Sequence, residues 1–268
     1  MLPCVSRVRA RRPVNNVPGR GRLESADAGL RGYPPVDNPT LDDRFEPDDH
    51  RLADAEVLVL RPDAAPVPVQ PSLSLDGQLC GLFAVDIAGF NTAERDDDIQ
   101  LYVHTALYAM LKLAFDRSEI PWADCAYEDR GDGVLIVVPP TLSVAGLVDP
   151  IPERLRALVR RHNRVSADAA HIQLRVAAHI GSVHYDGYGF VGHDVTLLCR
   201  LLDARPLKRM LARSGAEVAF IASKYLFDNV IRSRPSLVDP DVFQPMPVRV
   251  KETRTRAWAY ALGASPAA

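Results

Sequence analysis

Apolar positions repeat at two different periods over residues 78–262, and each period indicates a different kind of element. Short apolar or alternating runs predict strands at 79–87, 122–128, 134–138, 172–179, 218–221, 248–251 and 257–261. Apolar residues three or four apart predict helices at 97–115, 151–163, 194–202, 206–214 and 224–230. Two pairs of neighbouring strands are close enough to form hairpins. The pattern therefore predicts an α+β domain in which helices pack on a mainly antiparallel sheet.

The first 75 residues lack this periodicity. Segment 1–22 carries six arginines and no acidic residue, and segment 36–63 is acidic. Prolines interrupt both segments, and only 57–60 has the pattern of a short strand. We therefore expect residues 1–75 to form a largely disordered tail and residues 76–264 to form the folded domain. A solvated tail is favoured over a nucleic-acid or membrane-surface tether.

Composition narrows the class of protein. The 268 residues are 47% hydrophobic, which is enough for a sizeable core, and the net charge of −2 argues against a nucleic-acid-binding protein. No apolar run approaches the ~20 residues that span a bilayer, and the N-terminus lacks the apolar region of a signal peptide, so we expect a soluble cytoplasmic protein. Cys4, Cys80, Cys125 and Cys199 lack zinc-ligand spacing and are interpreted as reduced thiols.

Two aspartates end apolar, strand-like runs beside glycine. Asp86 is followed by Ile87-Ala88-Gly89-Phe90-Asn91, and Asp132 lies between Gly131 and Gly133. Two such carboxylates can hold two divalent cations, and the amides of Ala88, Gly89, Phe90 and Asn91 can surround an anionic ligand. Each aspartate also has an ordinary interpretation, as a helix or turn cap at Asp86 and as a tight-turn residue at Asp132. Their occurrence together favours metal binding.

Five segments in order resemble the catalytic domain of class III nucleotidyl cyclases, the adenylate and guanylate cyclases. They are the two aspartate segments, the strand at 174–183, the segment from Gly192 to Arg200 and Val250-Lys251-Glu252. The resemblance covers residues 78–262 and is that of a divergent bacterial member. It implies the ferredoxin-like class III cyclase fold for the domain at 76–264.

The resemblance also implies a reaction, in which a nucleoside triphosphate becomes a 3′,5′-cyclic nucleotide and pyrophosphate. Asp86, Ile87 and Asp132 would bind two Mg2+ or Mn2+ ions. The ribose 3′-oxygen would attack the α-phosphate, and Arg200 would stabilise charge on the transferring phosphate. Lys251 would contact the terminal phosphates. An ordinary surface role is the alternative for both basic residues.

The same resemblance places the active site between two copies of the domain. One protomer would contribute Asp86 and Asp132, and its partner would contribute the other residues of the site. These are Glu128, Thr196, Arg200 and Lys251. The expected assembly is therefore a homodimer with two equivalent sites.

Several positions depart from the family pattern. Thr196 replaces the asparagine that orients the ribose, so the protein could be a weakened enzyme. Asn91 replaces threonine or serine in the phosphate loop, which is a milder change because backbone amides make that contact. Glu128 occupies a base-reading position and can accept from guanine, so GTP is favoured, although Gly189 at the second base-reading position reads nothing.

Alternatives to an active purine cyclase remain open from the sequence. The first is a pyrimidine cyclase in antiviral signalling, which a stand-alone cyclase domain would suit. The second is a catalytically silent cyclase-like module that binds a nucleotide or dimerises, motivated by Thr196 and Gly189. The third is a nucleic-acid-binding protein, based on the arginines of segment 1–22.

Overall fold

The computed structural model describes residue 75 and residues 77–263, all within one compact unit, Val57–Ala268. The expectations for the tail, including the strand at 57–60, lie outside the described residues. The strands are β1 Gln78–Ile87, β2 Ala126–Asp129, β3 Gly133–Val138, β4 Leu174–Tyr185, β5 Phe190–Val191, β6 Val218–Ser223, β7 Gln244–Val250 and β8 Thr253–Leu262.

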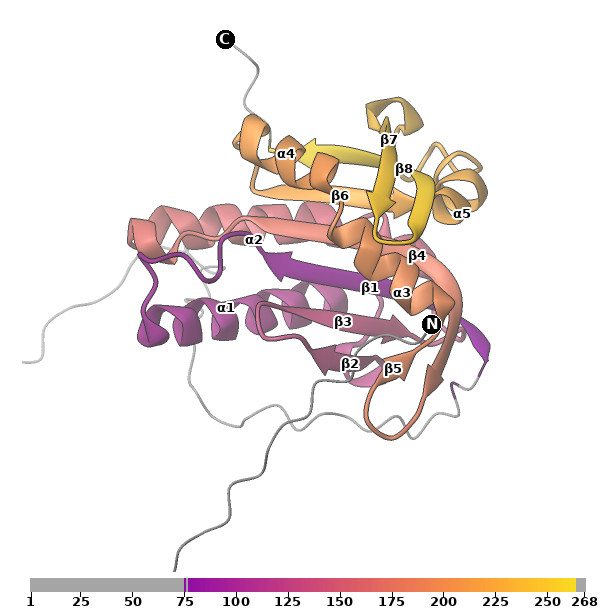
Figure 1. Cartoon of the computed structure of the whole chain (residues 1–268), viewed down its shortest axis with the longest axis horizontal. Coiled ribbons are helices and arrows are strands. Elements are labelled where there is room, and N and C mark those ends of the chain that lie inside the picture. The colour runs from indigo at the N-terminus through magenta and orange to yellow at the C-terminus, as the bar shows by residue number, and fades with distance from the viewer. Residues whose placement is uncertain (1–74, 76, 264–268) are drawn as a thin grey trace, which may run out of the picture. The chain divides into compact units, whose positions relative to one another are not determined.

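The strands form one sheet in the order β2-β3-β1-β4-β6-β8-β7, and the short β5 pairs with the far end of β4 (Figure 1). Every pair is antiparallel except β4–β6, which is parallel. A parallel pair needs a crossover connection, and two helices, α3 and α4, occupy it. The prediction of a mainly antiparallel sheet with helices packed on it is confirmed.

Helices cover both faces of the sheet. They are α1 Asp97–Asp116, α2 Ile151–Val165, α3 His193–Leu202, α4 Arg205–Ser214 and α5 Lys224–Leu226. Short 3-10 turns lie at Trp122–Asp124, Val144–Leu147, Asp168–Ala170 and Pro240–Val242, and a π turn lies at Phe227–Ile231. One core cluster joins the sheet to α1 and α2, and a second joins its other face to α3 and α4.

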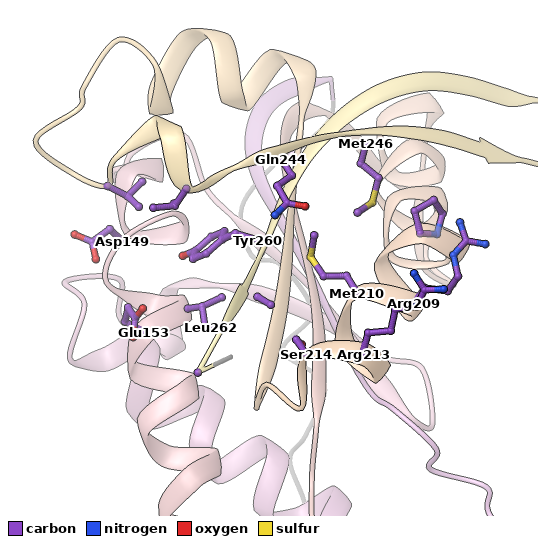
Figure 2. Close-up of a pocket in the computed structure, with 15 residues that line it drawn as sticks. Asp149, Glu153, Arg209, Met210, Arg213, Ser214, Gln244, Met246, Tyr260 and Leu262 are labelled. Atoms are coloured by element: carbon purple, nitrogen blue, oxygen red, sulfur yellow. The ribbon is translucent and has the colours of Figure 1, made fainter. Parts of the chain in front are cut away.

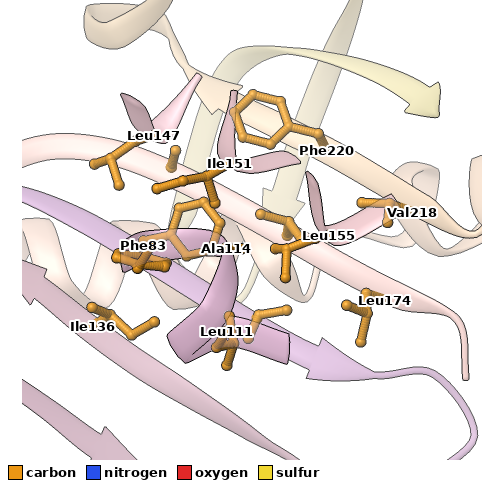
Figure 3. Close-up of a cluster of buried hydrophobic side chains, with 14 of the residues drawn as sticks. Phe83, Leu111, Ala114, Ile136, Leu147, Ile151, Leu155, Leu174, Val218 and Phe220 are labelled. Carbon is orange, nitrogen blue, oxygen red and sulfur yellow. The ribbon is translucent and has the colours of Figure 1, made fainter. Parts of the chain in front are cut away.

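The central strand β1 is buried from Cys80 to Ile87 because both of its faces are covered there. Phe83 packs with Leu111, Ile136 and Leu155 on the α1 and α2 side (Figure 3). Alternate residues of a strand point to opposite faces, and Leu82 and Ala84 belong to the other cluster. The side chain of Asp86 follows them and lies on the α3 and α4 side.

Several predicted elements have different bounds in the structure, and β4 extends to Tyr185, well beyond the predicted 172–179. The predicted strand at 122–128 begins as a 3-10 turn, because Asp116 accepts a hydrogen bond from the Trp122 amide at 2.7 Å and bends the chain there. The predicted helix at 224–230 becomes one α turn and a π turn. Strand β7 starts earlier than predicted, at Gln244, because an edge strand tolerates Pro245 and Pro247.

Candidate functional site

Asp86 and Asp132 lie at the same end of two paired strands. Asp86 is opposite Gly133 in the β1–β3 ladder, and the Ile87 amide donates to the Asp132 carbonyl oxygen at 2.8 Å. The charge of Asp132 contributes to the raised pKa of Asp86, although burial contributes more. A Cβ at position 133 would collide with the Val85 carbonyl oxygen, so glycine is needed for this approach. The two aspartates predicted from sequence are therefore neighbours.

Arg175 holds the Asp86 carboxylate from the adjacent strand. The two residues are opposite one another in the β1–β4 ladder, and Nε and Nη2 of Arg175 donate to Oδ1 and Oδ2 at 2.6 and 2.8 Å. Asp86 is 8% exposed. Burial raises its pKa to about 6, and Arg175 opposes that shift. Both oxygens are already engaged, so a cation bound at Asp86 would compete with a bidentate guanidinium.

Arg175→Gln should destabilise the protein strongly at pH 7.5 and weakly at pH 5. The substitution leaves the Asp86 carboxylate buried without its cation, which costs about 3 kcal/mol when the carboxylate is ionised. Below pH 6 Asp86 is protonated in the folded state, and the cost falls. Urea unfolding at both pH values measures the difference. Exposed Arg249→Gln is the control, and equal losses at both pH values would contradict the prediction.

The segment after β1 turns sharply at Gly89, whose φ of 67° lies in the left-handed region. The Ala88 amide donates to the Gln173 carbonyl oxygen at 2.9 Å. The Ala88 amide is therefore already engaged and would have to give up this hydrogen bond to meet an anion. Within residues 77–263, the amides of Gly89, Phe90 and Asn91 have no hydrogen-bond acceptor. These three amides are the ones that could meet a phosphate.

A second set of predicted residues gathers around α3. Glu128 on β2 accepts a hydrogen bond from the Phe190 amide at 2.9 Å. It also forms an ion pair with Arg130, whose Nε is 3.1 Å away. Arg130, Arg200 and Glu128 all act electrostatically on the Cys199 thiol, whose pKa is raised first by burial. Glu128 and Arg200 therefore lie near the same point of α3. Arg130 is therefore a direct neighbour of Glu128.

Arg200 extends from α3 towards the β7–β8 turn, which lies beside that helix in Figure 1. Its Nη2 is 3.4 Å from Oε1 of Glu252, and its side chain is 17% exposed. Its Nε is buried and has no acceptor in the described part of the chain. Lys251 precedes Glu252 in the turn and is exposed, as is Thr196 one helical turn before Arg200. A buried donor beside exposed basic and hydroxyl groups suits an anionic ligand.

The predicted site residues fall into two sets, and no hydrogen bond or ion pair within residues 77–263 joins one set to the other. The first set, called the aspartate set, consists of Asp86, Asp132 and the loop from Gly89 to Asn91. The second, called the α3 set, consists of Glu128, Thr196, Arg200 and Lys251. No group of three or more histidine, cysteine, aspartate or glutamate side chains among the described residues could hold a metal alone. Further ligands at the aspartate set would have to come from backbone or substrate oxygens.

Comparison with known proteins gives a structural likeness only. No protein-family model matches the chain, and no curated protein matches it. Among solved structures, an adenylate/guanylate cyclase/hydrolase from Silicibacter pomeroyi aligns over 69% of this chain and 98% of its own, with 18% identity and a TM-score of 0.50. The guanylyl cyclase Cya2 aligns over 72% and 97%, with 14% identity and a TM-score of 0.47. The guanylate cyclase domain of RhGC from Catenaria anguillulae, in complex with GTP, aligns over 70% and 98%, with 14% identity and a TM-score of 0.43.

The described domain has the class III cyclase fold. At these identities the likeness establishes the arrangement of strands and helices and leaves chemistry to be argued from the residues. None of the helices in the described ranges is long and apolar enough to cross a membrane. Cys80, Cys125 and Cys199 are free thiols, as expected from their spacing.

In this cyclase fold, α3 is anchored to the sheet by a buried histidine and an aspartate. Asp194 accepts from the Ser182 amide at 2.7 Å, and its Oδ1 is 3.4 Å from His179 Nε2. His179 Nδ1 is 2.7 Å from the Ser223 hydroxyl. Burial lowers the pKa of His179, which favours its neutral form. The chain of contacts fixes the start of α3 and so the direction of Thr196 and Arg200.

The turn that carries Asp132 is tied to α1 of the cyclase fold by Asp129. The Asp129 carboxylate accepts from the Gly131 amide at 2.8 Å, from the Tyr108 hydroxyl at 2.6 Å and from His104 Nε2 at 2.9 Å. Burial alone would raise the pKa of Asp129, but these hydrogen bonds bring it below its ordinary value. The structure shows a three-donor contact that holds the turn in place.

Proposed function

We propose that the chain is a metal-dependent nucleotidyl cyclase that converts a nucleoside triphosphate into a 3′,5′-cyclic nucleotide and pyrophosphate. The observation that carries the proposal is the adjacency of Asp86 and Asp132 at one end of β1 and β3, on the cyclase fold. Two neighbouring carboxylates beside free backbone amides can bind a cation-triphosphate complex. Arg200 and Lys251 of the α3 set carry positive charge that complements an anionic substrate.

The oxygen ligands that the aspartate set offers fit hard divalent cations. Its oxygens would come from the carboxylates of Asp86 and Asp132 and from the backbone carbonyl of Ile87, and Mg2+ and Mn2+ prefer such ligands. The negative charges of Asp86 and Asp132 repel one another, and a bound cation would remove this repulsion. When bound, the two ions would lower the cost of charge on the attacking and leaving oxygens.

The chain's own residues would position the substrate. The amides of Gly89, Phe90 and Asn91 would donate to the triphosphate, and Lys251 would meet its terminal oxygens. Arg200, with its buried Nε lacking an acceptor in the described residues, would donate to the phosphate that changes charge during the reaction. Thr196 is one turn from Arg200 on the same helix face and would donate to the ribose. Catalysis would come mainly from orientation and charge compensation.

A second copy of the chain would complete the site. The two residue sets have no bond between them in the described residues, and a two-fold axis can bring the aspartate set of one protomer against the α3 set of its partner. Tyr188 is 96% exposed on the β4–β5 hairpin, and Tyr185 and Val191 are exposed beside it. Exposed aromatic and aliphatic residues on a projecting hairpin favour burial in a protein interface.

Base choice depends on Glu128 and Arg130. Glu128 can accept from guanine, which favours GTP, but the Phe190 amide and Arg130 already engage both of its oxygens. Guanine would have to use the remaining lone pairs of Glu128 or displace Arg130. A base that presents carbonyl acceptors, such as uracil, would instead meet the Arg130 guanidinium directly. This contact is the observation that favours the pyrimidine cyclase as the second candidate function.

Incubation with each of the four nucleoside triphosphates tests the proposal. The purified full-length chain with Mn2+ or Mg2+ is expected to release pyrophosphate and one cyclic nucleotide, identified by mass spectrometry. Asp132→Asn is the inactive control. Absence of cyclic product from all four substrates would contradict the proposal. Metal-dependent nucleotide binding without pyrophosphate release would instead favour a catalytically silent module. If Thr196→Asn then gained activity, the lack of activity would be due to the contact of residue 196 with the ribose.

Asp129→Asn should lower turnover by about 10- to 100-fold, as outer-shell changes at metal sites do, with little loss of stability. Asparagine weakens the three contacts that hold the Asp132 turn but stays polar at a half-exposed position. Turnover and the Mn2+ concentration for half-maximal rate are the measurements. Asp124→Asn, an exposed change just before β2, is the control. Equal activity of the two variants would show that Asp129 does not position the turn.

A further inference from the structure

Strand β8 has a free edge near its end. It pairs with β6 through Leu262, but its pairing with β7 stops at Ala259, opposite Gln244. Residues 260–262 therefore have a strand neighbour on one side only. Half of the backbone donors and acceptors of such a segment point away from the sheet and can pair with another chain. The outer edge of β7, by contrast, carries Pro245 and Pro247, which discourage strand addition.

A cavity of about 770 Å³ lies along this free edge (Figure 2). It reaches both faces of the sheet, because Met246 belongs to the core cluster on the α3 and α4 side, whereas Leu262 belongs to the opposite cluster. The cavity is within the size range of sites that bind small molecules or peptide segments. None of its lining residues belongs to the aspartate set or the α3 set.

The two walls of the cavity carry opposite charge. Arg209 and Arg213 extend from α4, are exposed and have no ion-pair partner within residues 77–263. On the other wall are Asp149 and Glu153, and Glu153 pairs with Arg156 at 2.7 Å. Asp149 is partly buried and has no hydrogen bond to its carboxylate in the described residues, and burial raises its pKa. The positive and negative walls are on opposite sides of the free edge.

We propose that this cavity binds an extended peptide segment of a partner protein, which adds as a strand beside residues 260–262 of β8. Successive side chains of a strand point to opposite faces, so one side chain of the segment would meet Arg209 and Arg213, and the next would meet Asp149. The segment recognised is therefore one in which acidic and basic residues alternate. An apolar residue on the same face of the peptide as its acidic residues would contact Met210 and Met246.

Selection from a displayed library of random nine-residue peptides tests the inference, with the full-length chain as bait. The enriched peptides are expected to alternate acidic and basic residues. Binding of a fluorescent enriched peptide should weaken about tenfold in Arg209→Glu/Arg213→Glu and in Asp149→Lys. Arg205→Glu, on the same helix but outside the cavity, should bind as the unmodified chain does. Circular dichroism and thermal melting confirm that each variant is folded.

Three results would overturn the inference. The first is a selection that enriches no peptide above the starting library. The second is an enriched peptide whose affinity is unchanged in both cavity variants or falls equally in Arg205→Glu. The third is sedimentation showing that the chain associates with itself through this edge and that Arg209→Glu/Arg213→Glu abolishes the association, which would assign the edge to a second copy. None of these results depends on cyclase activity.

Discussion

Asp86→Asn is expected to make the protein more stable and almost inactive. Burial raises the pKa of Asp86 to about 6, so at pH 7.5 folding has to bury an ionised carboxylate, which is less favourable than burying a neutral group. Asparagine resembles the protonated carboxyl in shape and charge and can still accept from Arg175. The expected gain in the free energy of unfolding is about 3 kcal/mol at pH 7.5 in metal-free buffer. Turnover should fall about 10³-fold, because a metal ligand is lost.

The pH dependence separates this explanation from a general packing effect. A folded-state pKa above the unfolded value contributes stability below about pH 4, and that contribution is lost as pH rises through 6. The stability difference between Asp86→Asn and the unmodified chain should therefore be near zero at pH 4 and reach its full value by pH 7. Urea unfolding across this range measures it, with exposed Asp98→Asn as the control. A difference that does not vary with pH would contradict the account.

Two inactive variants are expected to restore activity when they share a dimer. Asp132→Asn damages the aspartate set, and Arg200→Ala damages the α3 set, so each homodimer should lose at least 10²-fold in turnover by order of magnitude. In a mixed dimer the intact aspartate set of one protomer meets the intact α3 set of its partner. Random pairing then gives about one quarter of the unmodified activity, because half of the dimers carry one complete site of two.

The measurement requires co-expression with two different tags and purification through both. Restoration to about one half in the doubly purified mixed dimer would agree with one working site of two. A mixture of Asp132→Asn with Asp86→Asn is the matched control, because both changes lie in the same set and no complete site can form. If the first mixture were as inactive as the control, both sets would act within one chain and the interface proposal would be wrong.

Local sequence pattern was sufficient for the elements that carry the aspartates. The apolar run before Asp86 predicted a strand, and the glycines beside Asp132 predicted its turn. Both predictions follow from burial and backbone freedom, which neighbouring residues determine. The start of β7 was predicted too late because Pro245 and Pro247 argue against a strand. The sequence does not show that this strand lies at an edge, where proline is tolerated.

The residues that sequence reasoning missed are those whose roles depend on pairing between distant segments. Arg175 stands 89 residues from Asp86 and meets it only because β1 and β4 pair in one register. The Ala88 amide is engaged by Gln173 for the same reason. A one-residue change of register would move Arg175 to the opposite face of the sheet, so no local pattern could have assigned its partner.

The contact between Arg175 and Asp86 also affects metal binding in the proposed reaction. Cations can bind at Asp86 only if they compensate for the loss of a bidentate ion pair at a buried position. Asp132 and the phosphate oxygens of a bound substrate supply additional ligands that make such an exchange favourable. The account therefore expects tight metal binding in the presence of nucleotide and weak binding in its absence.

Anomalous X-ray scattering at the manganese edge tests the central claim most directly. Crystals of the chain grown with Mn2+ and a non-hydrolysable nucleoside triphosphate analogue should show two peaks about 3.5–4 Å apart, in contact with carboxylate oxygens of Asp86 and Asp132. Bound nucleotide without a manganese peak at either aspartate, or with peaks only elsewhere on the chain, would contradict the account.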